Sequence, residues 1–370
     1  MERNILPVAV LILLAVAGSS STEFTLHEGW SYEGKLIDEV YLFDVTVVIL
    51  DDGRYRLYGE ASDIGNHTVV SYTSSDGLDF QKEDGYRLTG AFMPFAVKLA
   101  DGRFRLYYTD QAGNPPAPGA RAIMSATSED GLNFTVEGGD RLTYNGSSYE
   151  SAGIRSAKIL QLDNGTYRMY YHGIDGDEHW RVLSATSQNG LNWTREVGVR
   201  LDPSDLCQGV TRIGNVAPLI TPEGTYHLYV AALVCGDSFI NGILDITSSD
   251  GLTFTTDATA IIEGYGNDTA EINPEDPAAI MADSGIRIYF APYGAQGSVI
   301  QESGIHSVFF NGTSYITTTT VMEDECPLIG DEDPCDGTVS DFELLTYIED
   351  WVLGEVSDFD LLGAIENWSG

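Results

Sequence analysis

Four carboxylates in the chain, Asp44, Glu150, Glu275 and Asp276, have the side-chain chemistry of a hydrolytic site. Protein side chains cleave a glycosidic bond with a pair of carboxyl groups, one that donates a proton and one that acts as base or nucleophile. These candidate catalytic residues are spread over more than half of the sequence. Only a fold that brings distant segments to one place can assemble a site from them.

A second set of residues could bind a substrate beside these carboxylates. Arginines can hold carboxylate or hydroxyl groups through paired hydrogen bonds, although structural salt bridges explain arginines equally well. A lone histidine is more often structural than catalytic, and Trp180 could stack on a sugar ring or pack between elements of the fold. The candidate substrate-binding residues are Asp110, Arg155, His172, Asp175, Arg212 and Asn215.

The elements that must position these residues form an internal repeat. A strand, tight turn and strand recur at residues 50–58, 99–108, 162–171 and 221–229, and more loosely at 282–289. A glycine after Asp, Asn or Glu suits a tight hairpin turn, and the alternating aromatic and polar residues that follow suit a strand. The turn glycines are Gly53, Gly102, Gly165, Gly224 and Gly285.

A second hairpin follows each of the first four turns, with the pattern Ser-X-Asp/Asn-Gly-Leu-X-aromatic at 74–80, 128–134, 187–193 and 248–254. In the fifth unit, Asn311 and Gly312 take its place. Two hairpins in each of five units give four strands per unit, which is the content of a propeller blade. The sequence therefore predicts an all-β, five-bladed β-propeller over residues 22–323 rather than a β-sandwich. We interpret the repeated tyrosine pairs as strand core. Either residues 24–29 or residues 313–320 would close the ring.

The propeller also predicts where the site lies. Both sets of hairpin turns fall on one face, so the opposite face carries the starts of the innermost strands, where side chains from all blades converge. Counting back nine residues from each turn glycine gives these positions. They are Asp44, Met93, Ser156, Asn215 and Asp276.

This pattern resembles the five-bladed propellers of glycoside hydrolase families 43 and 32 and their relatives. In those enzymes an Asp-Pro pair often opens the inner strand, and an Asp of blade one acts as base or nucleophile. The resemblance assigns that role to Asp44, although Val45 replaces the proline, and blade five keeps the pair as Asp276-Pro277. It implies a carbohydrate partner and a propeller that needs no cofactor.

Two departures leave the activity open. The similar enzymes take their acid from the start of blade three, where this chain has Ser156, and blade two offers Met93 in place of a carboxylate. Glu150 or Glu275 would then be the acid. The alternative function is a non-catalytic propeller that binds glycan or protein at a surface.

The sequence changes character after about residue 324. Two near-identical segments, 339–351 and 356–368, predict a pair of short helices, because Ser before Asp-Phe caps a helix and apolar residues follow at helical spacing. The pair, with its linker spanning 324–370, resembles archaeal dockerin modules, which bind calcium and a cohesin-like partner. One calcium ion, held by Glu332, Asp336 and Glu343, or none is expected.

The remaining features concern export and charge. An apolar run within residues 1–21 followed by small residues predicts a signal peptide, and eight Asn-X-Ser/Thr sites fit a secreted or cell-surface glycoprotein. No later segment is long and apolar enough to span a membrane. The formal charge of −37 excludes nucleic acid as a partner, because like charges repel.

Overall fold

The computed structural model describes residues 24–61, 67–110, 122–206, 211–232, 242–255, 259–264, 273–282, 285–293 and 304–311. The chain divides into two compact units, residues 1–312 and 313–370, and every described residue belongs to the first. The predicted signal peptide at 1–21, the four cysteines and the dockerin-like segment at 324–370 lie outside the described residues.

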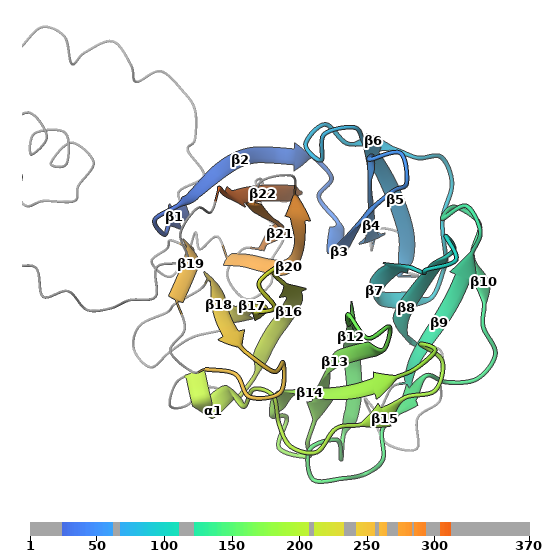
Figure 1. Cartoon of the computed structure of the whole chain (residues 1–370), viewed down its shortest axis with the longest axis vertical. Coiled ribbons are helices and arrows are strands. Elements are labelled where there is room, and N and C mark those ends of the chain that lie inside the picture. The colour runs from blue at the N-terminus through green and yellow to red at the C-terminus, as the bar shows by residue number, and fades with distance from the viewer. Residues whose placement is uncertain are drawn as a thin grey trace, which may run out of the picture. The chain divides into compact units, whose positions relative to one another are not determined.

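The described strands form five antiparallel sheets arranged as blades around a centre (Figure 1). Each innermost strand contacts the innermost strand of the next blade, and the contact between the fifth and the first closes the ring. The predicted five-bladed propeller is confirmed. The innermost strands, in blade order, are β3 (Leu42–Ile49), β7 (Ala91–Lys98), β12 (Gly153–Gln161), β16 (Ile213–Ile220) and β20 (Asn273–Ala282).

The other strands of each blade follow outward from the centre in chain order, except where the N-terminus adds strands to blades four and five. The second strands are β4 (Tyr55–Ala61), β8 (Phe104–Asp110), β13 (Tyr167–Ile174), β17 (Tyr226–Ala232) and β21 (Gly285–Tyr293). The third strands are β5 (Thr68–Ser74), β9 (Ala122–Ser128), β14 (Trp180–Ser187), β18 (Gly242–Ser248) and β22 (Ile305–Phe310). The outer strands are β6 (Gln81–Lys82), β10 (Thr135–Val136), β11 (Leu142–Thr143), β15 (Thr194–Arg195) and β19 (Thr259–Gly264).

The N-terminal segment completes two blades. β2 (Trp30–Ile37) pairs with β22 and is the fourth strand of blade five. β1 (Phe24–Leu26) pairs with β19 and adds a fifth strand to blade four. The N-terminus therefore closes the ring, but through residues 30–37 rather than the predicted 24–29. Residues 313–320 lie outside the described part of the chain.

Helical structure is sparse in the described residues. α1 (Pro203–Leu206) is a single turn between blades three and four. No helix in this part of the chain has the length and apolarity needed to cross a membrane.

The second hairpin of each of the first four blades is held by its own side chains. In blade two, the Asp130 carboxylate accepts hydrogen bonds from the backbone N–H groups of Leu132 and Asn133, at 2.8 and 2.9 Å, and the Ser128 hydroxyl accepts from Gly131 N–H. Gly131 has φ +72°, and a Cβ there would lie 2.5 Å from Arg56 of blade one. The turn motif thus needs glycine because the neighbouring blade approaches so closely.

That close approach is a recurring contact, which we call the blade latch. The Arg56 guanidinium and the Tyr58 hydroxyl of blade one each donate a hydrogen bond of 2.8 Å to a carbonyl of the blade-two turn, at Asp130 and Gly131. Arg56 also pairs with Glu83 of its own blade. The Tyr58 ring meets the motif aromatic Phe134 edge-on, at 5.9 Å between centroids.

The blade latch recurs at every seam whose turn is described. The other latching pairs are Arg105 and Tyr107, Arg168 and Tyr170, and Arg287 and Tyr289, which bind the turns at Asn189 and Gly190, Asp250 and Gly251, and Asp76 and Gly77. In blade four, His227 replaces the arginine and pairs with Asp245. The predicted assignment of the repeated tyrosines to the strand core is confirmed, since Tyr58, Tyr107, Tyr170 and Tyr289 are buried.

Apolar side chains fill the seams between blades. One buried cluster, for example, joins Leu57 and Tyr72 of blade one to Ile280 and Tyr289 of blade five. Burying a large apolar side chain stabilises a fold by roughly 1.5–3 kcal/mol, so the seams supply most of the cohesion and the latches fix their alignment.

We predict that Tyr170→Phe lowers the free energy of unfolding by about 1–3 kcal/mol. The change removes only the hydroxyl that donates to the Gly251 carbonyl at 2.8 Å, and a buried acceptor left without its donor costs about that much. Urea unfolding followed by tryptophan fluorescence measures it.

The matched control is Tyr86→Phe, which removes a hydroxyl from a side chain that is 61% exposed. Equal stability of the two variants would show that the latch hydroxyl contributes nothing to the seam.

Candidate functional site

The inner strands carry a backbone distortion at the predicted positions. Asp44, Met93, Ser156 and Asp276 have φ between +48° and +56°, and the strand pairing shifts register at each of them. A non-glycine residue in the left-handed region costs about 1–3 kcal/mol and persists only where the surroundings impose it. The count of nine residues back from the turn glycine therefore locates a real structural feature in four blades. At the remaining position, in blade four, Asn215 does not have a positive φ.

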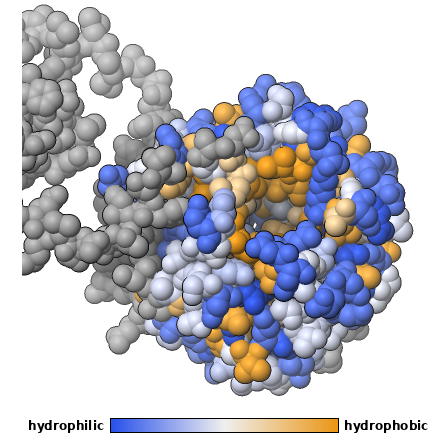
Figure 2. All heavy atoms as spheres, viewed as in Figure 1, coloured by the Kyte–Doolittle hydropathy of each residue, from blue (hydrophilic) through white to orange (hydrophobic). Residues whose placement is uncertain are grey.

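Asn215 joins the side chains of three other blades at the ring centre. Its side-chain N–H donates to Asp44 Oδ1 at 2.8 Å and makes a short hydrogen bond to Asp276 Oδ1. Its Oδ1 accepts a hydrogen bond of 2.8 Å from the Ser156 hydroxyl. The Asp44 backbone N–H also donates to Asp276 Oδ2 at 3.3 Å. Asp44, Asp276, Asn215 and Ser156 thus form one connected group, and Figure 2 shows the surface hollowed near the axis of the ring.

The two aspartates of this group are buried, each only 5% exposed. Burial raises the pKa of Asp44 well above its usual range, and the neighbouring Asp276 raises it further, whereas the Lys158 ammonium lowers it. Lys158 is itself 1% exposed, and burial lowers its pKa against the attraction of both aspartates. Two carboxylates buried so close together disfavour a negative charge on Asp44, and the Lys158 ammonium offsets part of that effect.

Glu60, at the end of β4, is a carboxylate that the sequence analysis did not identify. Its Oε2 accepts a hydrogen bond of 2.9 Å from the backbone N–H of Met93, and its Oε1 lies 2.5 Å from His67 Nδ1. Burial raises the pKa of Glu60, and its charge in turn raises the pKa of Asp44. A carboxylate from blade one therefore lies beside the start of the inner strand of blade two.

Glu275 precedes Asp276 on β20 and is half-buried. Burial and the negative charge of Asp276 raise the pKa of Glu275 to about 8. No hydrogen bond or ion pair joins its carboxyl to another described residue. At neutral pH Glu275 therefore carries a proton that it can donate.

Glu150 forms its hydrogen bonds with residues outside the group around Asn215. Its carboxylate accepts hydrogen bonds from the Tyr171 hydroxyl at 2.6 Å and from the Arg195 guanidinium at 2.9 and 2.8 Å. The residue is 1% exposed. With both oxygens bound by protein donors, Glu150 is placed to hold β13 and β15 together, and its contacts disfavour the predicted role as acid.

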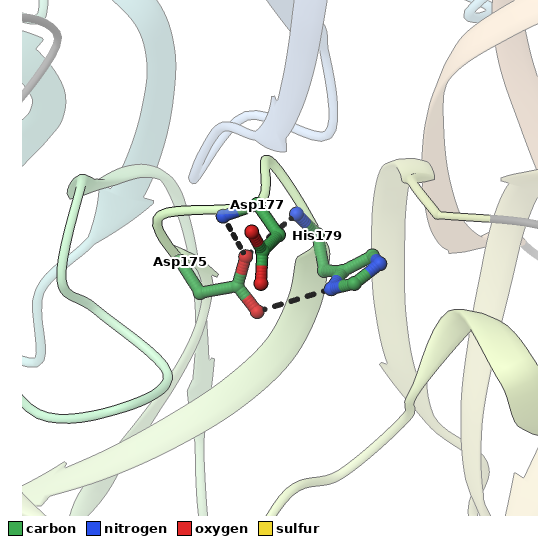
Figure 3. A group of neighbouring side chains, drawn as sticks. All are labelled: Asp175, Asp177 and His179. Carbon is green, nitrogen blue, oxygen red and sulfur yellow. Dashed lines mark hydrogen bonds and ion pairs between the residues drawn. The ribbon is translucent and has the colours of Figure 1, made fainter.

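Asp175 and its neighbours form a turn in which the Asp175 carboxylate accepts hydrogen bonds from the turn's own residues, as Figure 3 shows for Asp175, Asp177 and His179. Asp175 Oδ1 accepts the backbone N–H groups of Asp177 and His179, both at 2.9 Å, and Oδ2 is bound by Arg181 at 2.6 Å and His179 at 3.2 Å. The ligand atoms of Asp175, Asp177 and His179 lie within 4.8 Å of one another, close enough to hold a metal ion. The arginine on Oδ2 disfavours a cation there, so we interpret this turn as structural.

His172 is buried on β13, where its Nε2 donates to the Gly214 carbonyl of β16 at 3.0 Å. Burial, and then the charge of Arg155, lower the pKa of His172 to about 3. The imidazole is neutral and links blades three and four. This disfavours a role as acid.

The other predicted binding residues lie around the start of the inner strands. Arg155 directly precedes Ser156, and its guanidinium lies 4.2 Å from the centre of the Trp180 ring. Arg212 approaches the same ring at 5.1 Å and pairs with Glu178. Asp110 ends β8 opposite Ala91 and is partly buried. The predicted calcium ligands Glu332, Asp336 and Glu343 lie outside the described residues.

We predict that Glu150→Gln destabilises the fold by about 1–3 kcal/mol, because it removes the charge that binds the partly exposed Arg195 guanidinium and weakens the buried hydrogen bonds to it. Glu178→Gln, which alters an exposed pair, is the control and should change stability little. Thermal unfolding compares the two. A stable Glu150→Gln protein would contradict the structural role.

A second prediction concerns pH. Because the pKa of Glu275 is about 8 in the folded chain and 4.5 in the reference state, folding favours the protonated form. Its contribution to stability is complete below about pH 4.5 and is lost as pH rises towards 8. Glu275→Gln should remove that loss.

Urea unfolding of parent and variant at about pH 5 and pH 8.5 measures this effect. The parent should lose more stability than Glu275→Gln between the two conditions. Identical losses would mean that Glu275 ionises normally in the folded protein.

Comparison with solved structures places the chain among known propellers. A thermostable family-43 glycoside hydrolase is 15% identical, matches over 72% of this chain and 88% of its own, and gives a TM-score of 0.55. A family-32 β-fructofuranosidase from Bombyx mori is 17% identical over 76% of this chain and 62% of its own, less than two thirds of that enzyme, with a TM-score of 0.59. A protein of unknown function from Dyadobacter fermentans is 14% identical over 76% and 99%, with a TM-score of 0.51.

No protein-family model and no curated protein matches the sequence. At these identities the likeness shows the fold alone. The chain is an all-β five-bladed propeller that resembles glycoside hydrolases of families 43 and 32.

Proposed function

We propose that this propeller acts on glycans and hydrolyses a glycosidic bond at the ring centre. The observation that carries the proposal is the contrast between two carboxyl environments on neighbouring residues. Burial and the neighbouring Asp276 raise the pKa of Glu275 to about 8, whereas the Lys158 ammonium opposes the rise in the pKa of Asp44. Carboxyl groups whose environments separate their pKa values in this way are suited to divide the roles of acid and base.

In the proposed reaction, Glu275 gives its proton to the glycosidic oxygen as the bond to the sugar carbon breaks. Asp44, in its ionised form, either removes a proton from a water that attacks the sugar carbon, or attacks that carbon itself to form an ester. In the second route water then hydrolyses the ester and gives its proton to the deprotonated Glu275. Asn215 and Ser156 hold Asp44 and Asp276 in place, so the charge that develops on the sugar meets a fixed carboxylate. Glu60 stays beside the pair and disfavours a second negative charge on it.

We predict that Asp44→Asn and Glu275→Gln each lower kcat by a factor on the order of 10² or more on any glycan that the parent cleaves. Each change removes a positioned acid or base while keeping the shape of the side chain. Activity should also fall above about pH 8 in the parent, as Glu275 loses its proton.

Hydrolysis is followed by reducing-end release across plant, microbial and host glycans, with Asp101→Asn on the opposite face as the control. If both site variants hydrolyse at the parent rate, the assignment is wrong.

The second candidate function is glycan binding without cleavage. It is favoured by Met93 and Ser156, which stand where the similar enzymes carry carboxylates, and by the ion pair that occupies Glu150. A parent protein that binds a glycan and cleaves none would support this function.

The proposal extends to export and attachment. A signal peptide at 1–21 would direct the chain to secretion or the cell surface, where glycans are available. A dockerin-like pair of helices within 324–370 would tether it to a cohesin-like partner, with calcium held by Glu332, Asp336 and Glu343 if the loop binds one. The charge of −37 supports partners other than nucleic acid.

A further inference from the structure

Lys158 is a buried cation at the ring centre that the proposed reaction does not yet use. It is 1% exposed and lies on β12, two positions after Ser156, whose hydroxyl binds Asn215. Asn215 in turn binds the carboxylates of Asp44 and Asp276. Two residues of a strand span about 6–7 Å, which a lysine side chain can bridge. The connected group of the candidate site is therefore within reach of the Lys158 charge.

No other blade has a charged residue at the position of Lys158 on its inner strand. The equivalent residues in the other four blades are Thr46, Phe95, Ala217 and Ala278. The Lys158 ammonium lies 5.6 Å from the centre of the Phe95 ring, so an apolar side chain adjoins it. No hydrogen bond joins the ammonium to another described residue. Lys158 therefore acts on the carboxylates through its charge rather than through a direct contact.

The carboxylates around Lys158 disfavour one another's ionisation. Burial raises the pKa of Asp44, and the negative charges of Asp276 and Glu60 raise it further. The positive charge of Lys158 and, to a smaller extent, that of Arg155 lower it. The His172 imidazole nearby is neutral at ordinary pH, because burial lowers its pKa to about 3.

We propose that Lys158 is a positioning residue that keeps Asp44 ionised for the reaction. An ammonium and a carboxylate buried near each other each stabilise the charge of the other, because little water screens them. Without the ammonium, Asp44 beside Asp276 would take up a proton more readily. A protonated Asp44 can neither accept a proton from water nor attack the sugar carbon. The inference rests on the proposed function and adds the residue that controls its base.

The first test is the pH dependence of kcat in Lys158→Met and Lys158→Arg, measured on any glycan that the parent cleaves. Methionine removes the charge and arginine keeps it. The acidic limb of the profile, which follows the ionisation of Asp44, should move upward by at least about one pH unit in Lys158→Met. The alkaline limb, which follows Glu275, should stay in place. Lys158→Arg should keep the acidic limb of the parent.

The control is Lys82→Met, the same change at a lysine whose side chain is 49% exposed, and it should leave both limbs unchanged. A merely structural role of Lys158 would lower kcat equally at every pH. That result, with the acidic limb unmoved, would overturn the proposal.

The second test reads the Asp44 carboxyl without any activity. Carboxyl-carbon NMR of protein labelled in its aspartates follows this group, which is identified by its absence from Asp44→Asn. Asp44 should be ionised at neutral pH in the parent and should titrate at higher pH in Lys158→Met. If Lys158→Met does not fold, the parent alone decides, since a protonated Asp44 at neutral pH overturns the proposal.

The two tests separate this inference from the proposed function. Identical titration of Asp44 in the parent and in Lys158→Met removes the role of Lys158 and leaves glycan hydrolysis standing. A parent that cleaves no glycan while Asp44 titrates as expected removes the hydrolytic function and leaves the control of Asp44 by Lys158 in place.

Discussion

The hydrogen bonds that an arginine and a tyrosine of one blade donate to the next blade's turn are the constraint on which the ring depends. Apolar seams are not directional and would allow neighbouring blades to slide. The blade latch removes that freedom, because carbonyls such as those of Asp130 and Gly131 accept only within narrow distances and angles. It also explains why Gly131 follows Asp130 in the turn motif, since the latch occupies the space a side chain would need.

Ring closure uses the same interaction. Blade five has Arg287 and Tyr289 in the latch positions, but the glutamate that pairs with Arg287 is Glu33, from the N-terminal strand β2. Trp30 at the start of β2 packs on Phe310 of β22, with ring centres 5.2 Å apart. The first and last parts of the propeller therefore complete one latch together. An open ring would leave Arg287 without its partner glutamate.

The sequence predicted the parts of this molecule that repeat. The two glycine turns in each unit predicted the four strands of each blade. A fixed offset from the first turn glycine located Asp44 and Asp276, because the same pattern occurs in all five units. Glu60 and Lys158 were missed because each occurs at its repeat position in one blade only, so periodicity carries no signal for them. The closing strand was placed several residues too early, since its partner β22 lies far away in sequence. Glu150 was chosen by proximity in sequence, which could not reveal Arg195 as its partner.

Residues that repeat in every blade and residues that occur in one blade only lie towards different faces of the propeller. Latches lie on the face with the hairpin turns, and the aspartates and Lys158 lie towards the other. Burying Asp44, Asp276 and Lys158 together disfavours folding, as do the left-handed residues of four inner strands. A ring whose seams are fixed at the opposite edge can tolerate these costs, because each of these inner strands is paired along its length with a second strand. The same separation allows side chains at the ring centre to change without loss of the latches that fix the five blades.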